Sequence, residues 1–200
     1  MDYPTAAISL IRSEHRTLSA LLHAMQHLVR EIRAGQLEPD FALLRSMVYY
    51  IDVYPERMHH PKEEMYLFTP LAQHTNAADA DLAQLRGEHE NGARLIRDLG
   101  HALLCYEHEG AAGLTVFAAS VESYARFYAQ HMEREEKVIL PLAQKTLLPE
   151  EWISLEHAFS DNHDPLRGDA RELHFRRLFS HIVNHAPPPI GVGPAQVAAR

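Results

Sequence analysis

The chain has 200 residues, of which 46% are hydrophobic, a formal net charge of −8 and a single cysteine, Cys105. This length suits one domain, or one domain with an extension. The acidic balance argues against nucleic acid as a partner, and one cysteine excludes an internal disulfide framework or a Cys-based metal cluster. We expect Cys105 to be a small buried hydrophobe. Without a secretory signal or an 18-residue apolar run, we expect no membrane segment and a cytoplasmic location.

The first predicted helix spans residues 5 to about 33. Apolar residues recur there at steps of three and four, which is typical of an amphipathic helix with one buried face. His15 takes one of the places in this apolar stripe, whereas His23 and His27 fall outside it. Gly35 ends the helix. The pattern therefore predicts that His15 is buried.

The second predicted helix opens at Pro39, which can occupy the first helical position. It runs to a loop at Thr75–Asp79 and carries the motif His-His-Pro-Lys-Glu-Glu at positions 59–64. The apolar residues that precede the motif are spaced as one helical face. They are Phe41, Leu44, Val48 and Ile51.

Two choices of inward-facing residues are open in this motif. At about 100° per residue, Glu63 lies about 40° from His59, and both fall on the apolar face. His60 lies about 100° from His59, towards the edge of that face. We therefore prefer His59 with Glu63. His60 with Glu64 is the second choice, because Pro55 can kink the helix and shift its phase.

The third and fourth predicted helices also place polar residues on apolar faces. The third runs from about residue 80 to 108 and carries His89, with Gly92 as the next member of its stripe. Gly92 removes bulk where something must fit closely. In the fourth helix, His131 and Glu135 are consecutive members of the buried face. A buried carboxylate is costly unless it is paired or bound to a metal.

An extension follows the four helices. Pro149 begins a new predicted helix with Trp152, Leu155 and Phe159, and Asp164-Pro165 can open another short one. The proline-rich end of the chain predicts a tail. The predicted organisation is a helical domain over residues 1–146, a helical extension over 147–185 and a flexible tail over 186–200.

The sequence contains an internal repeat about 70 residues long. Glu-His at positions 14 and 15 recurs at 88 and 89, and His-x-x-x-Glu at 59–63 recurs at 131–135. Each half is a helical hairpin that could not bury its polar residues alone. Packed together, the halves form an all-α four-helix bundle with a metal site in its middle. The candidate metal ligands are His15, His59, Glu63, His89, His131 and Glu135.

The ligand types narrow the choice of metal. Four imidazoles and two carboxylates without a thiolate suit iron, manganese or zinc. Two carboxylates on facing helices can bridge two ions, which leaves two histidines and open positions for each ion. Glu14 and Glu88 precede ligand histidines in the sequence, and either orient a ligand or face solvent.

The ordered set of motifs resembles the hemerythrin-like family of HHE cation-binding domains, over about residues 5–146, and looks like its bacterial type with four His and two Glu. The resemblance implies an up-down-up-down four-helix bundle. It also implies a cofactor of two non-haem iron ions with carboxylate and oxo bridges. In the family pattern the first Glu of the second-helix pair is the bridging one, which again favours Glu63 and His59.

One departure from the family pattern bears on function. Oxygen-carrying members have a second His four residues after the third-helix His, where this chain has Ala93. The resemblance then implies two His per iron and disfavours reversible O2 carriage. The pattern looks more like family members that sense iron, oxygen or nitric oxide, or that repair iron–sulfur clusters. The repair members usually carry a cysteine-bearing N-terminal segment, which is not seen in this sequence.

We therefore expect a protein without catalytic residues that binds iron and senses O2 or NO, or acts in a stress response. A di-iron enzyme acting on peroxide or nitric oxide is the first alternative, and a structural metal-bound bundle is the second. A small ligand is the expected partner, with no nucleic acid and no membrane. A homodimer is a candidate assembly.

Overall fold

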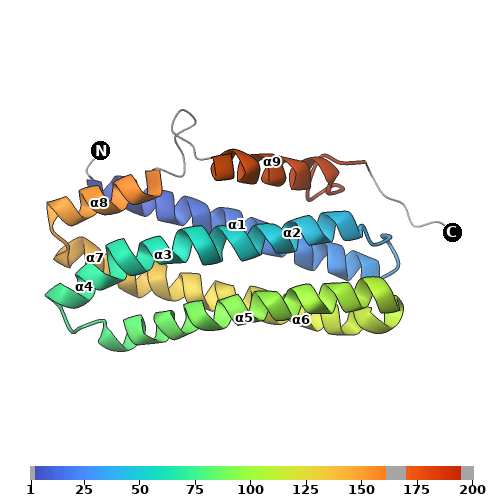
Figure 1. Ribbon diagram of the computed structural model, residues 1–200, viewed down its shortest axis with the longest axis horizontal. Coiled ribbons are helices and arrows are strands. Elements are labelled where there is room, and N and C mark those ends of the chain that lie inside the picture. The colour runs from blue at the N-terminus through green and yellow to red at the C-terminus, as the bar shows by residue number, and fades with distance from the viewer. Residues whose placement is uncertain (1–2, 161–169, 195–200) are drawn as a thin grey trace.

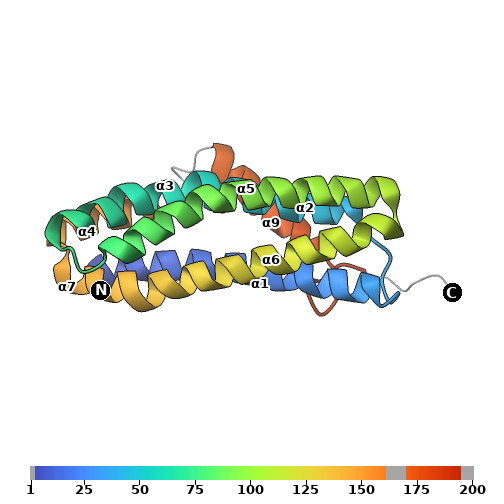
Figure 2. The ribbon, with the colours of Figure 1, turned by 90° about the horizontal axis from the view of Figure 1, so that it is seen from below.

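Four helical columns run up and down along one axis in the computed structural model, which describes residues 3–160 and 170–194 (Figure 1, Figure 2). This arrangement confirms the predicted all-α bundle. The first column is α1 (Tyr3–Arg33) and the third is α5 (Asp79–Glu109). The second column comprises α2 (Phe41–Tyr54), η1 (Pro55–His59), α3 (His60–Glu63), η2 (Glu64–Phe68) and α4 (Thr69–His74). The fourth column comprises α6 (Ala111–Arg134), η3 (Glu135–Ile139) and α7 (Leu140–Thr146).

Local signals set the ends of the columns. The chain leaves α1 through Gly35, whose φ of 69° lies in the left-handed region that glycine adopts without strain. The side chain of Asp40 caps the next helix by accepting a hydrogen bond from the backbone N–H of Leu43 at 2.9 Å. Pro39 therefore precedes this helix and does not open it. The sharp reversal between α5 and α6 is made at Gly110, whose φ is 63°.

Three π-helical segments, η1, η2 and η3, interrupt the second and fourth columns, and each is followed at its second position by a proline. A proline ring clashes with the carbonyl four residues before it, and that residue is the centre of the π segment in each case. The wider π turn moves this carbonyl away from the ring. The three prolines are Pro61, Pro70 and Pro141.

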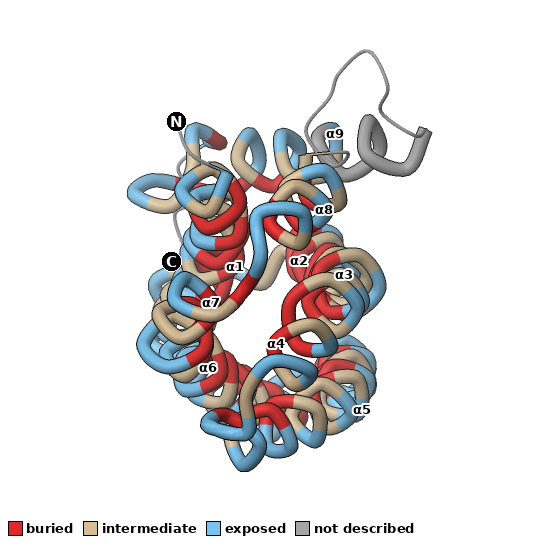
Figure 3. The backbone as a smooth tube through the Cα atoms, turned by 90° about the vertical axis from the view of Figure 1, so that its left-hand side faces the viewer, coloured by how far each residue is buried: buried red, intermediate tan, exposed pale blue. Residues whose placement is uncertain are grey.

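The buried residues face the interior of the bundle (Figure 3). Two hydrophobic clusters lie on either side of a polar layer in this interior. Along α1, Ile11 belongs to one cluster and Leu18 to the other, and His15 lies between them. Along α5, His89 lies in the same way between Leu85 and Ile96. The apolar clusters thus hold the four columns in register around the polar residues.

The remaining helices lie on the outside of the bundle (Figure 1). Helix α8 (Pro149–Ser160) begins at the predicted proline and packs against α1 through buried side chains. Helix α9 (Ala170–His185) packs along α2. The second predicted helix start, Asp164-Pro165, lies outside the described residues. The buried apolar residues of α8 are Trp152, Leu155 and Phe159.

The segment that follows α9 differs from the predicted tail as far as residue 194. Its backbone folds back on α9, because Val192 N–H donates to the carbonyl of Val183 at 2.9 Å and Gly193 N–H to that of Ala186 at 3.0 Å. Residues 195–200 of the predicted tail lie outside the described part of the chain. Among the helices of residues 3–160 and 170–194, none combines the length and apolar character that crossing a membrane requires.

The prediction for Cys105 was wrong, since its side chain is exposed on α5. The buried face of this part of α5 is formed by Ala102, Leu103 and Tyr106. Cys105 follows Leu104, which is also exposed, on the solvent face of the same helical turn.

Candidate metal centre

The polar layer of the bundle gathers side chains from all four columns. Glu63 and Glu135 are completely buried, with no exposed surface, at the centre of this layer. Six histidine and glutamate side chains surround them, of which all but His89 are almost fully buried. The surrounding residues are Glu14, His15, His59, His60, His89 and His131.

The carboxylate of Glu63 divides its two oxygens between two groups of imidazoles. Its Oε1 lies 3.1 Å from His59 Nε2 and 3.9 Å from His15 Nε2. Its Oε2 lies 3.8 Å from His89 Nε2 on the other side. Glu63 therefore lies between two groups: His15 of α1 and His59 of η1 on one side, and His89 of α5 on the other.

The carboxylate of Glu135 has the same relationship to the histidines from the opposite column. Its Oε2 lies 3.3 Å from His15 Nε2. Its Oε1 lies 3.2 Å from His131 Nε2 and 3.8 Å from His89 Nε2. The two carboxylates thus both lie between the pair His15–His59 and the pair His89–His131, with one oxygen towards each pair.

A second carboxylate contacts the outer nitrogen, Nδ1, of each of these four histidines. Because a carboxylate only accepts, the Nδ1 atom carries the proton, and in the neutral ring Nε2 then presents its lone pair to the centre. The outer carboxylates come from the internal repeat. They are the glutamate of each Glu-His pair and the second glutamate of each Glu-Glu pair. The contacts are His59 with Glu14 at 2.6 Å, His131 with Glu88 at 3.0 Å, His15 with Glu136 at 3.0 Å and His89 with Glu64 at 3.1 Å.

Several buried polar atoms at the centre have no hydrogen-bond partner among the described residues. They include both oxygens of Glu63, both oxygens of Glu135, and the Nε2 atoms of His89 and His131. Leaving such atoms without a partner costs free energy, and buried carboxylates are the most costly. In addition, His15 Nε2 and His59 Nε2 lie only 3.3 Å apart. Lone pairs and negative charge that converge in this way fit a bound cation.

The electrostatics of the centre couple the imidazoles to the carboxylates. Burial lowers the pKa of His131, but the charge and close approach of Glu135 and the hydrogen bond to Glu88 outweigh it and raise this pKa to about 10. Burial also lowers the pKa of His59, but Glu63 and Glu14 outweigh this effect, so the pKa of His59 is raised well above its usual value. For Glu135, burial raises the pKa, but His131 and its neighbours hold it well below the usual range.

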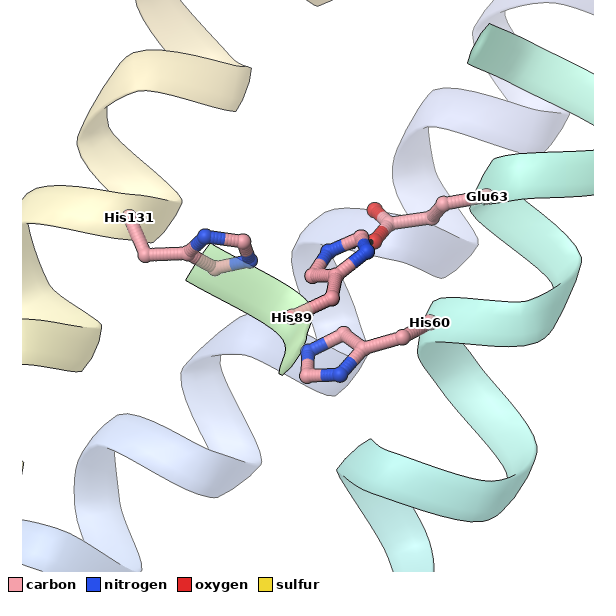
Figure 4. Close-up of side chains that lie close together, drawn as sticks. All are labelled: His60, Glu63, His89 and His131. Carbon is pink, nitrogen blue, oxygen red and sulfur yellow. Dashed lines mark ion pairs between the residues drawn. The ribbon is translucent and has the colours of Figure 1, made fainter. Parts of the chain in front are cut away.

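The structure brings His59 and His60 to the centre together, although the sequence treated them as alternatives. Both are 4% exposed, and the side chains of His60, Glu63, His89 and His131 point towards one another (Figure 4). The preferred pair, His59 and Glu63, lies at the centre, and His60 is buried there as well because η1 is a π segment that ends at His59, so the uniform angle of an α-helix does not apply. The sequence signal for this change in helix geometry is Pro61, which directly follows the His-His pair.

The second-choice partner of His60, Glu64, does not join the central carboxylates. It is half-buried and its carboxylate accepts from His89 Nδ1 at 3.1 Å and from Arg86 Nε at 3.0 Å. These contacts hold the pKa of Glu64 below its usual value, although burial, the largest single effect, raises it. Glu64 therefore orients His89 from outside the centre.

The outer helix α8 closes the centre beside His59. The ring of Phe159, which has no exposed surface, meets the His59 ring edge-on, with centroids 5.4 Å apart and an interplanar angle of 85°. Lys62 Nζ lies 5.8 Å from the centre of the Phe159 ring. The sequence predicts α8, but it carries no signal that this phenylalanine would contact a site histidine.

The family profile of the Hemerythrin HHE cation binding domain matches residues 6–143. The chain belongs to the hemerythrin HHE cation-binding family. Uncharacterized proteins of Mycobacterium tuberculosis and Mycobacterium bovis are similar to this HHE protein, with 24% identity over 169 residues. The aligned stretch covers 84% of this chain and 66% of each relative, so the chain spans about two thirds of the length of these curated relatives.

Family membership and the cluster of histidines and glutamates together indicate that this HHE domain binds a metal cation. Among the residues that the structure describes, two groups of side chains have ligand atoms close enough together to hold an ion, within 4.8 Å of one another in each group. Glu63 belongs to both groups. The first group is His60, Glu63, His89 and His131, and the second is His15, His59 and Glu63.

Proposed function

We propose that this protein holds two iron ions, bridged by Glu63 and Glu135, and binds a small ligand such as O2 or NO in a sensing or stress-response role. The observation that carries the proposal is the division of each carboxylate's oxygens between two pairs of imidazoles. A single ion would need only one side of each carboxylate. Two ions use both oxygens, which is the arrangement that a bridging carboxylate provides.

The donor set suits iron. Imidazole and carboxylate ligands without thiolate bind iron well, and iron adds the capacity to bind and reduce small oxidants that zinc lacks. His15 and His59 would hold one ion, and His89 and His131 the other. The four outer carboxylates keep each Nδ1 protonated and each ring in place, so that every Nε2 is available as a ligand.

A cavity beside the centre supports access by a small ligand. Its volume is about 450 Å³, and it lies between α1 and the fourth column. His15 forms part of its wall, with Arg12, Met132, Glu136 and Lys137 around it. The His15 side chain is 5% exposed, and its Nε2 lies 3.3 Å from Glu135 Oε2, so His15 belongs both to the wall of this cavity and to the centre. A diatomic molecule could reach the centre by a small displacement of side chains on this wall.

The test is a titration of anaerobically prepared, iron(II)-loaded protein with NO and with O2, followed by absorption spectroscopy. We expect a spectral change that saturates near one ligand per pair of ions, with Glu135→Ala as the variant that loses it. Continued consumption of NO or peroxide over many equivalents would instead establish the enzyme alternative. A loaded protein whose spectrum responds to none of these ligands would leave only the structural role.

A further inference from the structure

His60 lies among the candidate ligands without being part of the repeated motifs. Its ring stacks on the ring of His89, with centroids 4.1 Å apart and planes 14° from parallel, and it meets His131 at 5.4 Å. A ring nitrogen of His60 lies within 4.8 Å of ligand atoms of Glu63, His89 and His131 (Figure 4). The position that corresponds to His60 in the second half of the repeat is Met132, which has no imidazole, so the repeat does not account for His60.

Residues from three columns form the surroundings of His60. Glu56, one turn earlier, places its Oε2 3.4 Å from His60 Nδ1. The Tyr128 hydroxyl donates a hydrogen bond to Glu56 Oε1 and lies 3.5 Å from His60 Nε2. A Cβ atom at Gly92 would lie 2.9 Å from Glu56 Oε1 and 3.1 Å from the Tyr128 hydroxyl. The absence of a side chain at Gly92 therefore makes room for the pair that flanks His60.

These contacts do not satisfy His60. Its Nδ1 atom is buried and has no hydrogen-bond partner among the described residues, because its approach to Glu56 lacks hydrogen-bond geometry. A histidine kept only for packing would be expected to have its ring nitrogens paired or exposed to water. His60 thus has a buried, unpaired Nδ1 atom and a ring nitrogen within reach of ligand atoms of three candidate ligands, and a histidine with both features is suited to be a metal ligand.

We propose that His60 is a fifth imidazole ligand and binds the ion that His89 and His131 hold. This inference rests on the proposed two-ion site. It makes the centre asymmetric, with three imidazoles on one ion and two, from His15 and His59, on the other. The ion with fewer protein ligands has more open positions, so an external ligand binds on the His15 side, which borders the cavity.

The asymmetry has a direct spectroscopic test. We would load the wild-type chain and His60→Gln with isotopically enriched iron(II) without air and record Mössbauer spectra and iron affinity. We expect two distinct iron environments of equal area in the wild type. In His60→Gln the two should become similar, and the affinity for one of the two ions should fall at least about 10-fold. His101→Gln, which changes an exposed histidine of α5, is the matched control and should resemble the wild type.

The outcomes separate this inference from the proposed function. Two irons bound with the same spectrum and affinity in His60→Gln and wild type would overturn the role of His60 and leave the two-ion site intact. Failure of the wild type to bind two ions would overturn the proposed function itself. If His60→Gln did not fold, as judged by circular dichroism, the wild-type spectrum would still decide, because a single iron environment would contradict three-plus-two ligation.

Discussion

The carboxylate of Glu14 accepts a hydrogen bond from Nδ1 of His59 at 2.6 Å, and both side chains are buried. The pair joins the first column to the second across the centre of the bundle. Its counterpart in the second half of the repeat is Glu88 with His131, at 3.0 Å. Each Glu-His motif therefore supplies two functions: the His faces the centre, and the Glu that precedes it orients a histidine of the next column.

Replacing Glu14 by Gln should weaken metal binding without removing a proposed ligand. The amide keeps the size of the side chain but loses the charge that stabilises the orientation and basicity of His59. Such outer partners of ligand histidines typically contribute about 10–100-fold in metal affinity. We expect a loss in that range in a competition titration with a chelator. Glu90→Gln, which changes an exposed carboxylate on α5, should bind metal like the wild type.

Removal of either central carboxylate should abolish binding of two ions. In Glu63→Ala or Glu135→Ala both ions lose one oxygen ligand. The centre also loses one of its two negative charges, and the remaining carboxylate cannot replace it. Metal analysis of the purified variants should give one ion per chain or fewer. Glu133→Ala removes an exposed carboxylate of α6 two residues before Glu135 and should retain the full content. Two tightly bound ions in either central variant would refute the bridging assignment.

The contact between Phe159 and His59 makes α8 a cover for the centre. Phe159→Ala should lower the free energy of unfolding by about 3–5 kcal/mol, because a buried aromatic ring is removed. The opening should also let solvent and chelators reach the centre, so bound metal should dissociate faster. Stopped-flow measurement of metal transfer to a chelator would check this. Val116→Ala, at a residue 59% exposed, should change neither property, and an unaltered transfer rate in Phe159→Ala would refute the covering role.

Metal binding should release protons. Before metal binds, His131 has a pKa raised to about 10, chiefly because Glu135 and Glu88 outweigh the effect of its burial, so its ring is protonated at neutral pH. Its Nε2 must lose that proton to become a ligand. The metal affinity should therefore rise with pH up to about 10 and fall as the pH is lowered.

Calorimetry near neutral pH in two buffers with different ionisation enthalpies would count these protons. We expect release of at least about one proton per chain on metal binding. Glu88→Gln should reduce the release, because the hydrogen bond that Glu88 accepts from His131 Nδ1 is one of the contacts that raise the pKa of His131. Heats that do not depend on the buffer would contradict the linkage between metal and protons.

Periodicity in the sequence predicted the bundle because most of each column is a regular α-helix with one apolar face. It also placed His15, His89, His131 and Glu135 inside, since α1, α5 and α6 are uninterrupted up to these residues. The internal repeat indicated that the two halves pack together around one site. These inferences depend only on helix geometry, which one sequence specifies well.

The second column was harder to predict because its geometry changes within the motif. The π segment η1 ends at His59, so an angle of about 100° per residue does not carry through to His60. Pro61, Pro70 and Pro141 mark the three π segments, and the first of them was visible in the motif. The contact of Phe159 with His59 depends on how α8 folds back over α1, which no local pattern specifies.

The measurement that tests the two-ion centre most directly is the iron content of anaerobically purified protein, with an absorption spectrum before and after exposure to air. Two irons per chain, together with new near-ultraviolet bands after air that are typical of a bridged iron pair, would be the result expected from a centre shared by Glu63 and Glu135. One iron or none per chain, with an unchanged spectrum, would contradict it.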